Sequence, residues 1–202
     1  SAYHVGMAAQ YVFEDLARIP VRVELASEFR YRNPILDKNG LAIIVSQSGE
    51  TADSLAALRE CKARGIRTLA IVNVIGSSIA READNVFYTL AGPEISVATT
   101  KAYSTQLIAA YVLALQFAKI RSEITEEQCD AYVKELKTLP EKIKRILEDK
   151  ERLQWFASKQ ANAKDIFFIG RGIDYAISLE GSLKMKEISY IHSEAYAAGE
   201  LK

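Results

Sequence analysis

Two short, uninterrupted apolar runs constrain the fold of this chain more than any other feature of its sequence. Residues 41–45 read Leu-Ala-Ile-Ile-Val, and residues 68–72 read Thr-Leu-Ala-Ile-Val. Such runs, without alternating polar residues, are typical of strands that are buried on both faces. Between them, residues 51–64 have a helical pattern that Gly65 ends. Buried strands separated by helices predict an α/β fold with a flavodoxin-like parallel sheet flanked by helices.

The segments around these strands extend the same alternation. Apolar residues at helical spacing, and a Pro20 that ends the first such pattern, mark the helices. The remaining elements predicted before residue 122 are helices over 3–19, 77–83 and 99–121 and strands over 21–25 and 86–90. After residue 122 we expect helices over about 125–138 and 140–163, a buried strand over 166–169 and a helix over 174–191.

The start and the end of the chain share one apolar pattern. A shift of 172 residues without a gap pairs Tyr3 with Tyr175, Phe13 with Met185 and Glu28 with Glu200. We interpret this as a duplicated α/β unit whose second copy is truncated, although two amphipathic helices can also match by chance. The predicted organisation is a first unit over 1–121 that lacks its first strand, a helical connector over 122–163 and the start of a second unit over 164–202.

Composition narrows the classes of function. The 26 basic and 26 acidic side chains give a formal net charge of zero, which argues against a nucleic-acid partner. The longest apolar run, 107–115, is shorter than the roughly 20 residues that cross a bilayer, and no secretory signal begins the chain. Cys61 and Cys129 show no metal-ligand spacing. We expect a cytoplasmic protein with reduced thiols, no metal, no cofactor and no membrane partner.

A polar loop joins the first buried strand to the helix after it. It reads Ser46-Gln47-Ser48-Gly49-Glu50-Thr51. Free amides at a helix N-terminus, three hydroxyl groups and a glycine that allows close approach suit a phosphate group. The loop has no lysine, so it is not a nucleotide-binding P-loop, and a small phosphate monoester fits it better. The alternative is that the Ser and Thr side chains only cap the helix.

Two further polar segments are candidates for a site. On the predicted helix over 174–191, Glu180, Lys184 and Glu187 lie on one face. They form either a surface ion pair or a carboxylate beside a lysine in a cleft, where Glu187 would move a proton next to a carbonyl carbon. The loop over 94–101 would line a site as well, although capping of the long helix by Thr99 also explains its polarity.

Several of these stretches together resemble a known family. They include Ser46–Asp53, Thr99–Ala102, Lys186–His192 and Ala195–Lys202. In this order and spacing they are similar to the isomerase domains of the glutamine–fructose-6-phosphate aminotransferase family, over essentially the whole chain. The resemblance implies the sugar isomerase (SIS) fold, with two α/β units of flavodoxin-like character.

The resemblance also implies roles for individual residues. By this similarity, the residues that hold the phosphate of a hexose are Ser46, Gln47, Ser48 and Thr51. Those that contact the sugar hydroxyls are Val97 and Thr99. Glu187 is the carboxylate that transfers the proton, and Lys184 is the lysine near the reacting carbons. The implied reaction converts fructose 6-phosphate and glutamine-derived ammonia to glucosamine 6-phosphate, with a proton moved between C1 and C2 and without a metal or an organic cofactor. The parent enzyme is expected to be a homodimer with a glutaminase domain.

The chain departs from the family pattern at two places. Ala2 stands where many members have a serine on the sugar phosphate, and the family histidine for ring opening would follow Lys202. We therefore expect this stretch to be part of a longer enzyme and to be inactive alone. The alternative is a non-catalytic SIS module that senses a sugar phosphate, and a closer relative is a deglycase or a simple sugar isomerase of the same fold. A sensor has no need of a base at Glu187.

Overall fold

The computed structural model of the chain describes residues 1–201, and its first half is built on a three-stranded parallel sheet. The strands, in spatial order, are β1 (Leu41–Ser46), β2 (Arg67–Val72) and β3 (Asn85–Tyr88). Ile43 of β1 pairs with Leu69 of β2, and Ile71 of β2 pairs with Phe87 of β3. Because the strands run in one direction, the loops after their carboxyl ends lie at one edge of the sheet.

Helices cover both faces of this sheet. They are α1 (Ala2–Leu16), α2 (Ala26–Phe29), α3 (Ala52–Ala63), α4 (Ser78–Glu82) and α5 (Lys101–Ile120). Side chains on a strand alternate between its faces. Ile43 and Val45 therefore pack against the α1–α5 pair, whereas Ile44 packs with Leu58 of α3 and Ile79 of α4. The two sides enclose the apolar strands that the sequence predicts.

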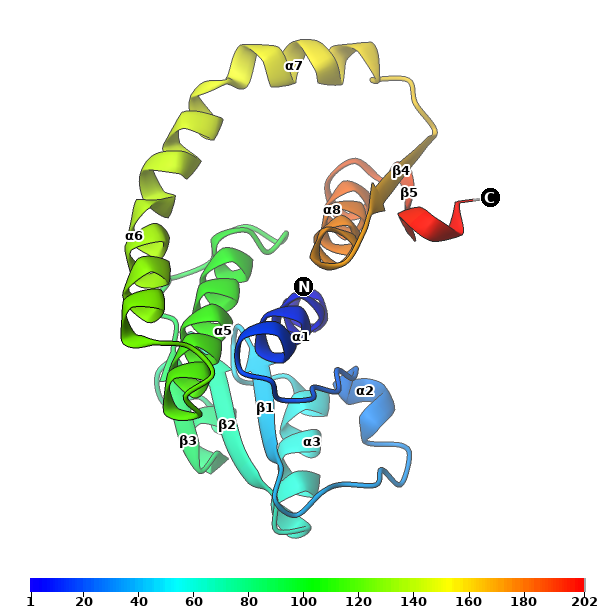
Figure 1. Cartoon of the computed structure of the whole chain (residues 1–202). Helices are drawn as coiled ribbons and strands as arrows, with labels where there is room; N and C mark the ends of the chain where they lie inside the picture. The colour runs from blue at the N-terminus through cyan, green and yellow to red at the C-terminus, as the bar shows by residue number, and fades with distance from the viewer. Residues whose placement is uncertain (202) are drawn as a thin grey trace.

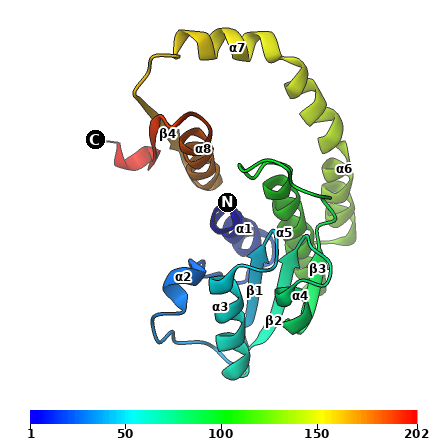
Figure 2. The same ribbon diagram turned by 180° about the vertical axis from the view of Figure 1, so that it is seen from behind.

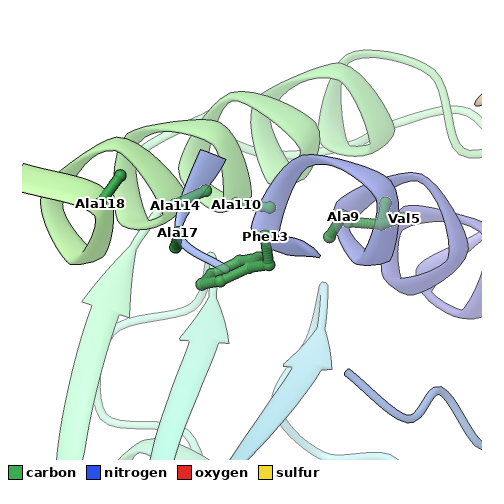
Figure 3. Close-up of a cluster of buried hydrophobic side chains, with 7 residues drawn as sticks. All are labelled: Val5, Ala9, Phe13, Ala17, Ala110, Ala114 and Ala118. Atoms are coloured by element: carbon green, nitrogen blue, oxygen red, sulfur yellow. The ribbon is translucent and has the colours of Figure 1, made fainter. Parts of the chain in front are cut away.

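Small side chains allow α1 and α5 to lie close together (Figure 3). Ala110, Ala114 and Ala118 recur every four residues on α5 and so form one ridge of that helix. The ridge faces Phe13 and Ala9 of α1, and both helices are side by side in Figures 1 and 2. Close approach of two backbones at this seam leaves little space for larger residues.

The second half begins with a long connector. It consists of α6 (Glu126–Glu148) and α7 (Lys150–Lys159), which form an arch away from the rest of the molecule (Figures 1 and 2). The chain then forms β4 (Asp165–Gly170), α8 (Ile173–Ser189), β5 (His192–Ala197) and the short helix η1 (Ala198–Glu200). β4 and β5 pair in parallel, and α8 packs against both strands and against α1. The predicted α/β class with parallel sheets is thus confirmed.

The predicted strand over 21–25 is wrong. This segment is extended between α1 and α2, but it joins neither sheet in the described residues 1–201. Side chains of α1 satisfy its backbone instead. Glu14 accepts a hydrogen bond from the Val21 N–H at 3.1 Å, and the Gln10 amide donates to the Val21 carbonyl at 3.0 Å. An alternating pattern therefore predicts an extended conformation here but not a strand pairing.

Two boundaries in the second half also differ from the predictions. The helix break expected at Pro140 is wrong, because α6 continues through Pro140 and ends at Glu148. The residues around Pro140 are largely exposed, so water can bond the carbonyl that proline leaves free. The helix predicted up to residue 191 ends earlier, at a left-handed Tyr190, and the strand β5 that follows was not predicted. The duplication by a 172-residue shift stays a prediction.

Candidate functional site

The loop between β1 and α3 folds around the Ser46 hydroxyl. Ser46 is buried at the end of β1, and its Oγ accepts a hydrogen bond from the Gly49 N–H at 3.1 Å. The same Oγ lies 3.4 Å from the Thr51 Oγ1. The Ser48 Oγ accepts from the Glu50 N–H at 3.2 Å. These bonds curl the loop over the N-terminus of α3, whose free amides favour an anion.

The second wall of this loop comes from the segment before α4. The Ile79 N–H donates to the Gly49 carbonyl at 2.9 Å, and the Ser78 N–H donates to the Glu50 carboxylate at 2.7 Å. This contact with Ser78 lowers the pKa of Glu50. The Ser77 Oγ and the Gln47 Oε1 are buried and have no hydrogen-bond partner among residues 1–201. The loop therefore holds polar atoms that the described residues leave unsatisfied.

The interpretation of this loop as a simple helix cap does not match its geometry. Thr51 occupies the N-cap position of α3, but its side chain makes no capping hydrogen bond. Ser48 and Thr51 are exposed, so both hydroxyls can reach a ligand. Gly49 has a φ of +67°, which glycine adopts without strain. Amides, hydroxyls and an open approach are together the chemistry of a site for a phosphate group.

The second group of candidate residues lies on α8. The Lys184 ammonium contacts the Glu187 carboxylate and lies 3.5 Å from a Glu180 oxygen. Glu180 is buried, whereas the Glu187 side chain is 35% exposed. One lysine thus stands between an inaccessible carboxylate and an accessible one. The exposed carboxylate is the one that can take a proton from a bound molecule.

Residues from the start of the chain complete this cluster. The Ser1 hydroxyl donates to Glu180 at 2.6 Å, and the His4 Nδ1 lies 2.7 Å from the other Glu180 oxygen. Burial by itself raises the pKa of Glu180, but the bonds from His4 and Ser1 and the nearby positive charges outweigh it and hold this pKa at about 2. Sequence analysis missed both partners, since His4 shows no recognisable ligand spacing and 176 residues separate it from Glu180.

The third candidate segment is the loop before α5. Val97 is fully exposed and Thr99 is half-buried. The expected capping of α5 by Thr99 is wrong, because the N-cap position is Thr100 and the Glu94 carboxylate accepts its backbone N–H. The start of α5 lies close to the α8 cluster, since burial and the charge of Glu180 both raise the pKa of Tyr103. No sequence signal marked Glu94 as a capping residue.

The structure thus places the candidate residues in three groups, which are the loop Ser46–Thr51, the α8 cluster and the loop before α5. Within residues 1–201, no hydrogen bond or ion pair joins the loop Ser46–Thr51 to the α8 cluster. Helix α1 lies between them, since it packs on β1 and bonds Glu180 through its first residues. In the same part of the chain, no cluster of three or more potential metal ligands is present, and no helix has the length and apolarity of a membrane span.

Comparison with known proteins shows the family of this fold. A family description for the SIS domain matches residues 1–116 and 160–202. The chain belongs to the SIS domain family. The match omits residues 117–159, which include all of α6 and α7, so the family pattern lies on the two α/β parts and not on the connector.

The relatives of this SIS chain are longer proteins. It is 59% identical over 202 residues to the glutamine–fructose-6-phosphate aminotransferase (isomerizing) of Clostridium tetani, and equally similar to that of Caldanaerobacter subterraneus. All of the chain but only 33% of either relative is covered. The C-terminal domain of glucosamine-fructose-6-phosphate aminotransferase from Francisella tularensis superposes with a TM-score of 0.97 at 42% identity, and this covers 99% of the chain and 57% of that domain.

Proposed function

We propose that this chain is the sugar-phosphate-binding isomerase part of an enzyme that makes glucosamine 6-phosphate from fructose 6-phosphate and glutamine-derived ammonia. The observation that supports it most is the exposed Glu187 beside Lys184 on α8, together with an anion-binding loop on the first sheet. Relatives at 59% identity are named for that reaction. A sensor of sugar phosphates needs the loop but not the base.

The proposed chemistry divides between the three groups. Ser46, Gln47, Ser48 and Thr51 hold the phosphate, and Val97 and Thr99 contact the sugar hydroxyls. Ammonia adds at C2 of the open ketose, water leaves and an imine results. Glu187 then takes a proton from C1 while the imine nitrogen gains one, which gives an enolamine. Glu187 returns its proton to C2, and the C1 hydroxyl gives up its own proton and becomes the aldehyde. The phosphate anchor supplies binding energy away from these carbons.

Lys184 has a separate role in this scheme. Its ammonium stabilises the negative charge of Glu187 before the proton is taken and the charge of the enolate-like transition state afterwards. Glu180 keeps Lys184 close to Glu187, because the buried Glu180 carboxylate pairs with the same ammonium. The Glu180–Lys184 ion pair expected from helical spacing and the proposed catalytic pair Lys184–Glu187 therefore share one lysine.

The organisation of the parent protein belongs to the same proposal. Residues 1–121 form a first SIS unit, 122–163 a connector and 164–202 the start of a second unit. This division is supported by the two separate sheets and by a family match that omits 117–159. The parent would be a cytoplasmic homodimer, and its own glutaminase domain would supply the ammonia. The glutamine in the name shared by the relatives supports such a domain.

A melting experiment tests the binding part. Glucosamine 6-phosphate at about 100 times its dissociation constant should stabilise the chain by about 2.7 kcal/mol, which raises the melting temperature by a few degrees. Inorganic phosphate and glucosamine at the same concentration serve as controls. The double variant Ser46→Ala, Thr51→Ala should lose the shift. An equal shift with glucosamine alone would contradict a phosphate-binding loop.

A chimera tests the catalytic part. In this chimera the chain replaces the matching 33% of the Clostridium tetani relative. The chimera should support synthesis of glucosamine 6-phosphate. Glu187→Gln in this chimera should lower kcat by about 10²–10⁴-fold, because a positioned base is lost, and leave sugar-phosphate binding nearly unchanged. Full activity of the Glu187→Gln chimera would exclude Glu187 as the base.

A further inference from the structure

Two side chains hold the segment between β3 and α5 at its ends. The first is Asn73, which follows β2. Its Oδ1 accepts the Ala91 N–H at 2.7 Å and the Thr89 hydroxyl at 3.1 Å, and its Nδ2 donates to the Gly92 carbonyl at 2.7 Å. The Asn73 N–H itself donates to the Gln47 carbonyl at 3.2 Å. The start of this segment is thus fixed to the loop that we propose for the phosphate.

The second is Glu94, which caps α5 from six residues upstream. Its carboxylate accepts the Thr100 N–H at 3.4 Å, the Thr100 hydroxyl at 3.2 Å and the Ala102 N–H at 3.2 Å. Thr100, at the N-cap position, makes no capping bond with its own side chain. The bond from Ala102 lowers the pKa of Glu94, as expected for a carboxylate at a helix N-terminus. One side chain therefore closes residues 94–100 into a loop.

Packing of its own side chains does not explain why the loop over 94–100 holds this shape. Ala98 is buried, but Ile95 and Val97 project almost fully into solvent. With Asn73 as its only anchor, a loop of this size with exposed apolar residues would be mobile. Ordering the loop when a ligand binds would cost free energy and so weaken affinity. The Glu94 bonds remove part of that mobility in advance. They also fix the loop next to the first turn of α5, where Tyr103 lies near Glu180.

We propose that Glu94 is a positioning residue that holds the Val97–Thr99 backbone in place for the hydroxyl groups of a sugar phosphate. This rests on the function proposed above, because it assigns the loop to the sugar and the Ser46–Thr51 loop to the phosphate. Glu94 touches no substrate itself. Its loss should therefore weaken binding of the sugar part and spare binding of the phosphate part.

Calorimetric titration of the full chain separates these two contributions. Glu94→Ala should weaken glucosamine 6-phosphate binding by about tenfold and leave the dissociation constant of inorganic phosphate within about twofold of the parent. Glu94→Gln keeps one acceptor oxygen and should restore much of the affinity. Glu127→Ala is the matched control, since the Glu127 carboxylate also accepts from a helix N-cap hydroxyl, that of Thr125, but on the connector. It should change neither constant.

Hydrogen exchange at the start of α5 gives a readout that needs no ligand. The amides of Thr100 and Ala102 should exchange faster in Glu94→Ala, while those of β2 stay protected as evidence of an intact fold. Faster exchange with unchanged sugar-phosphate affinity, or equal weakening of both ligands, would overturn the positioning role. If the parent chain binds neither ligand while these amides are protected, the proposed function itself fails.

Discussion

Gly49 shows how strictly one residue of the phosphate loop is constrained. Its φ is +67°, and an added Cβ would lie 2.1 Å from the Ser77 Oγ. Gly49→Ala should therefore lower the free energy of unfolding by the cost of a left-handed alanine, about 1 kcal/mol, and by a further 1–3 kcal/mol or so for the overlap. Urea unfolding of the variant measures the total.

Gly76 is a matched control for this prediction. It has a φ of +72° but no atom within 4 Å of an added Cβ, so Gly76→Ala should lose only the backbone cost of about 1 kcal/mol. Combining Gly49→Ala with Ser77→Gly should restore the stability that is lost to the overlap but not the stability that is lost to the backbone conformation. Equal losses in Gly49→Ala and Gly76→Ala would show that the contact with Ser77 relaxes freely.

Glu180 carries a prediction on pH. Its pKa is about 2 in the folded chain and about 4.3 in an unfolded one, so its contribution to stability is complete above roughly pH 5 and is lost as the pH falls towards 2. Glu180→Gln should lower the free energy of unfolding at pH 7 by about 1–3 kcal/mol, because His4 and Ser1 lose a charged partner. The difference from the parent should shrink at pH 3.

Glu187→Gln is the control on the same helix. Glu187 pairs with the same lysine, but at a more exposed position, so its removal should cost no more than about 1 kcal/mol at pH 7. Denaturant midpoints at both pH values give the comparison. A Glu180→Gln loss that stays constant down to pH 3 would mean that packing of the side chain, and not its charge, stabilises the α1–α8 contact.

The start of helix α6 is stabilised by hydrogen bonds between residues that are close along the chain. Its first turn forms a capping box, in which the Thr125 Oγ1 accepts the Gln128 N–H at 3.2 Å and the Gln128 side chain accepts the Thr125 N–H at 2.9 Å. None of its residues is buried. Since tertiary packing contributes little to this helix, its N-terminal bonds are a larger share of its stability.

Thr125→Ala should therefore loosen the start of α6 without unfolding the molecule. The cap is worth about 1 kcal/mol, so exchange of the Gln128 amide should accelerate about fivefold, while the global melting temperature changes little. Thr138→Ala is the control, because Thr138 lies inside the helix and its hydroxyl only bonds the Glu135 carbonyl. In Thr138→Ala, exchange of the Gln128 amide should be unchanged or slower. A large drop in melting temperature for Thr125→Ala would show that α6 is coupled to the core.

At the scale of the whole molecule, the connector carries the largest set of exposed apolar side chains. Members of this set that are more than half exposed are Ile146, Leu147, Leu153, Trp155 and Phe156. Large apolar side chains that are exposed on two consecutive helices promote association of soluble proteins. We expect the chain to self-associate at micromolar concentration and to bind a hydrophobic dye.

A double variant tests this expectation. Ile146→Lys with Phe156→Lys should shift the chain towards the monomer in light scattering and reduce dye binding, since charges on both helices interrupt the apolar surface. Ile120→Lys is the control, because Ile120 is exposed at the end of α5 and lies outside the connector. It should leave the association state unchanged. A monomeric parent chain that binds no dye would contradict the prediction.

Local patterns explain what sequence reasoning could and could not predict. The strands at 41–46 and 67–72 and the helices after them depend on neighbouring residues, and the structure agrees with them. The anion-binding role of the loop Ser46–Thr51 stays a prediction. The helix spacing of Glu180 and Lys184 likewise predicts their ion pair. The strand over 21–25 fails because strand pairing needs a partner that an alternating pattern cannot specify.

The sequence by itself therefore determined the α/β class and most of the helices and strands, because these depend on residues that are close along the chain. Only the tertiary structure decided which groups meet. Glu180 contacts Ser1 and His4 across 179 and 176 residues. Such contacts depend on how α1 packs between α5 and α8. Hydrogen bonds within a turn follow from short-range spacing, whereas buried charges take whichever partners the packed elements bring to them.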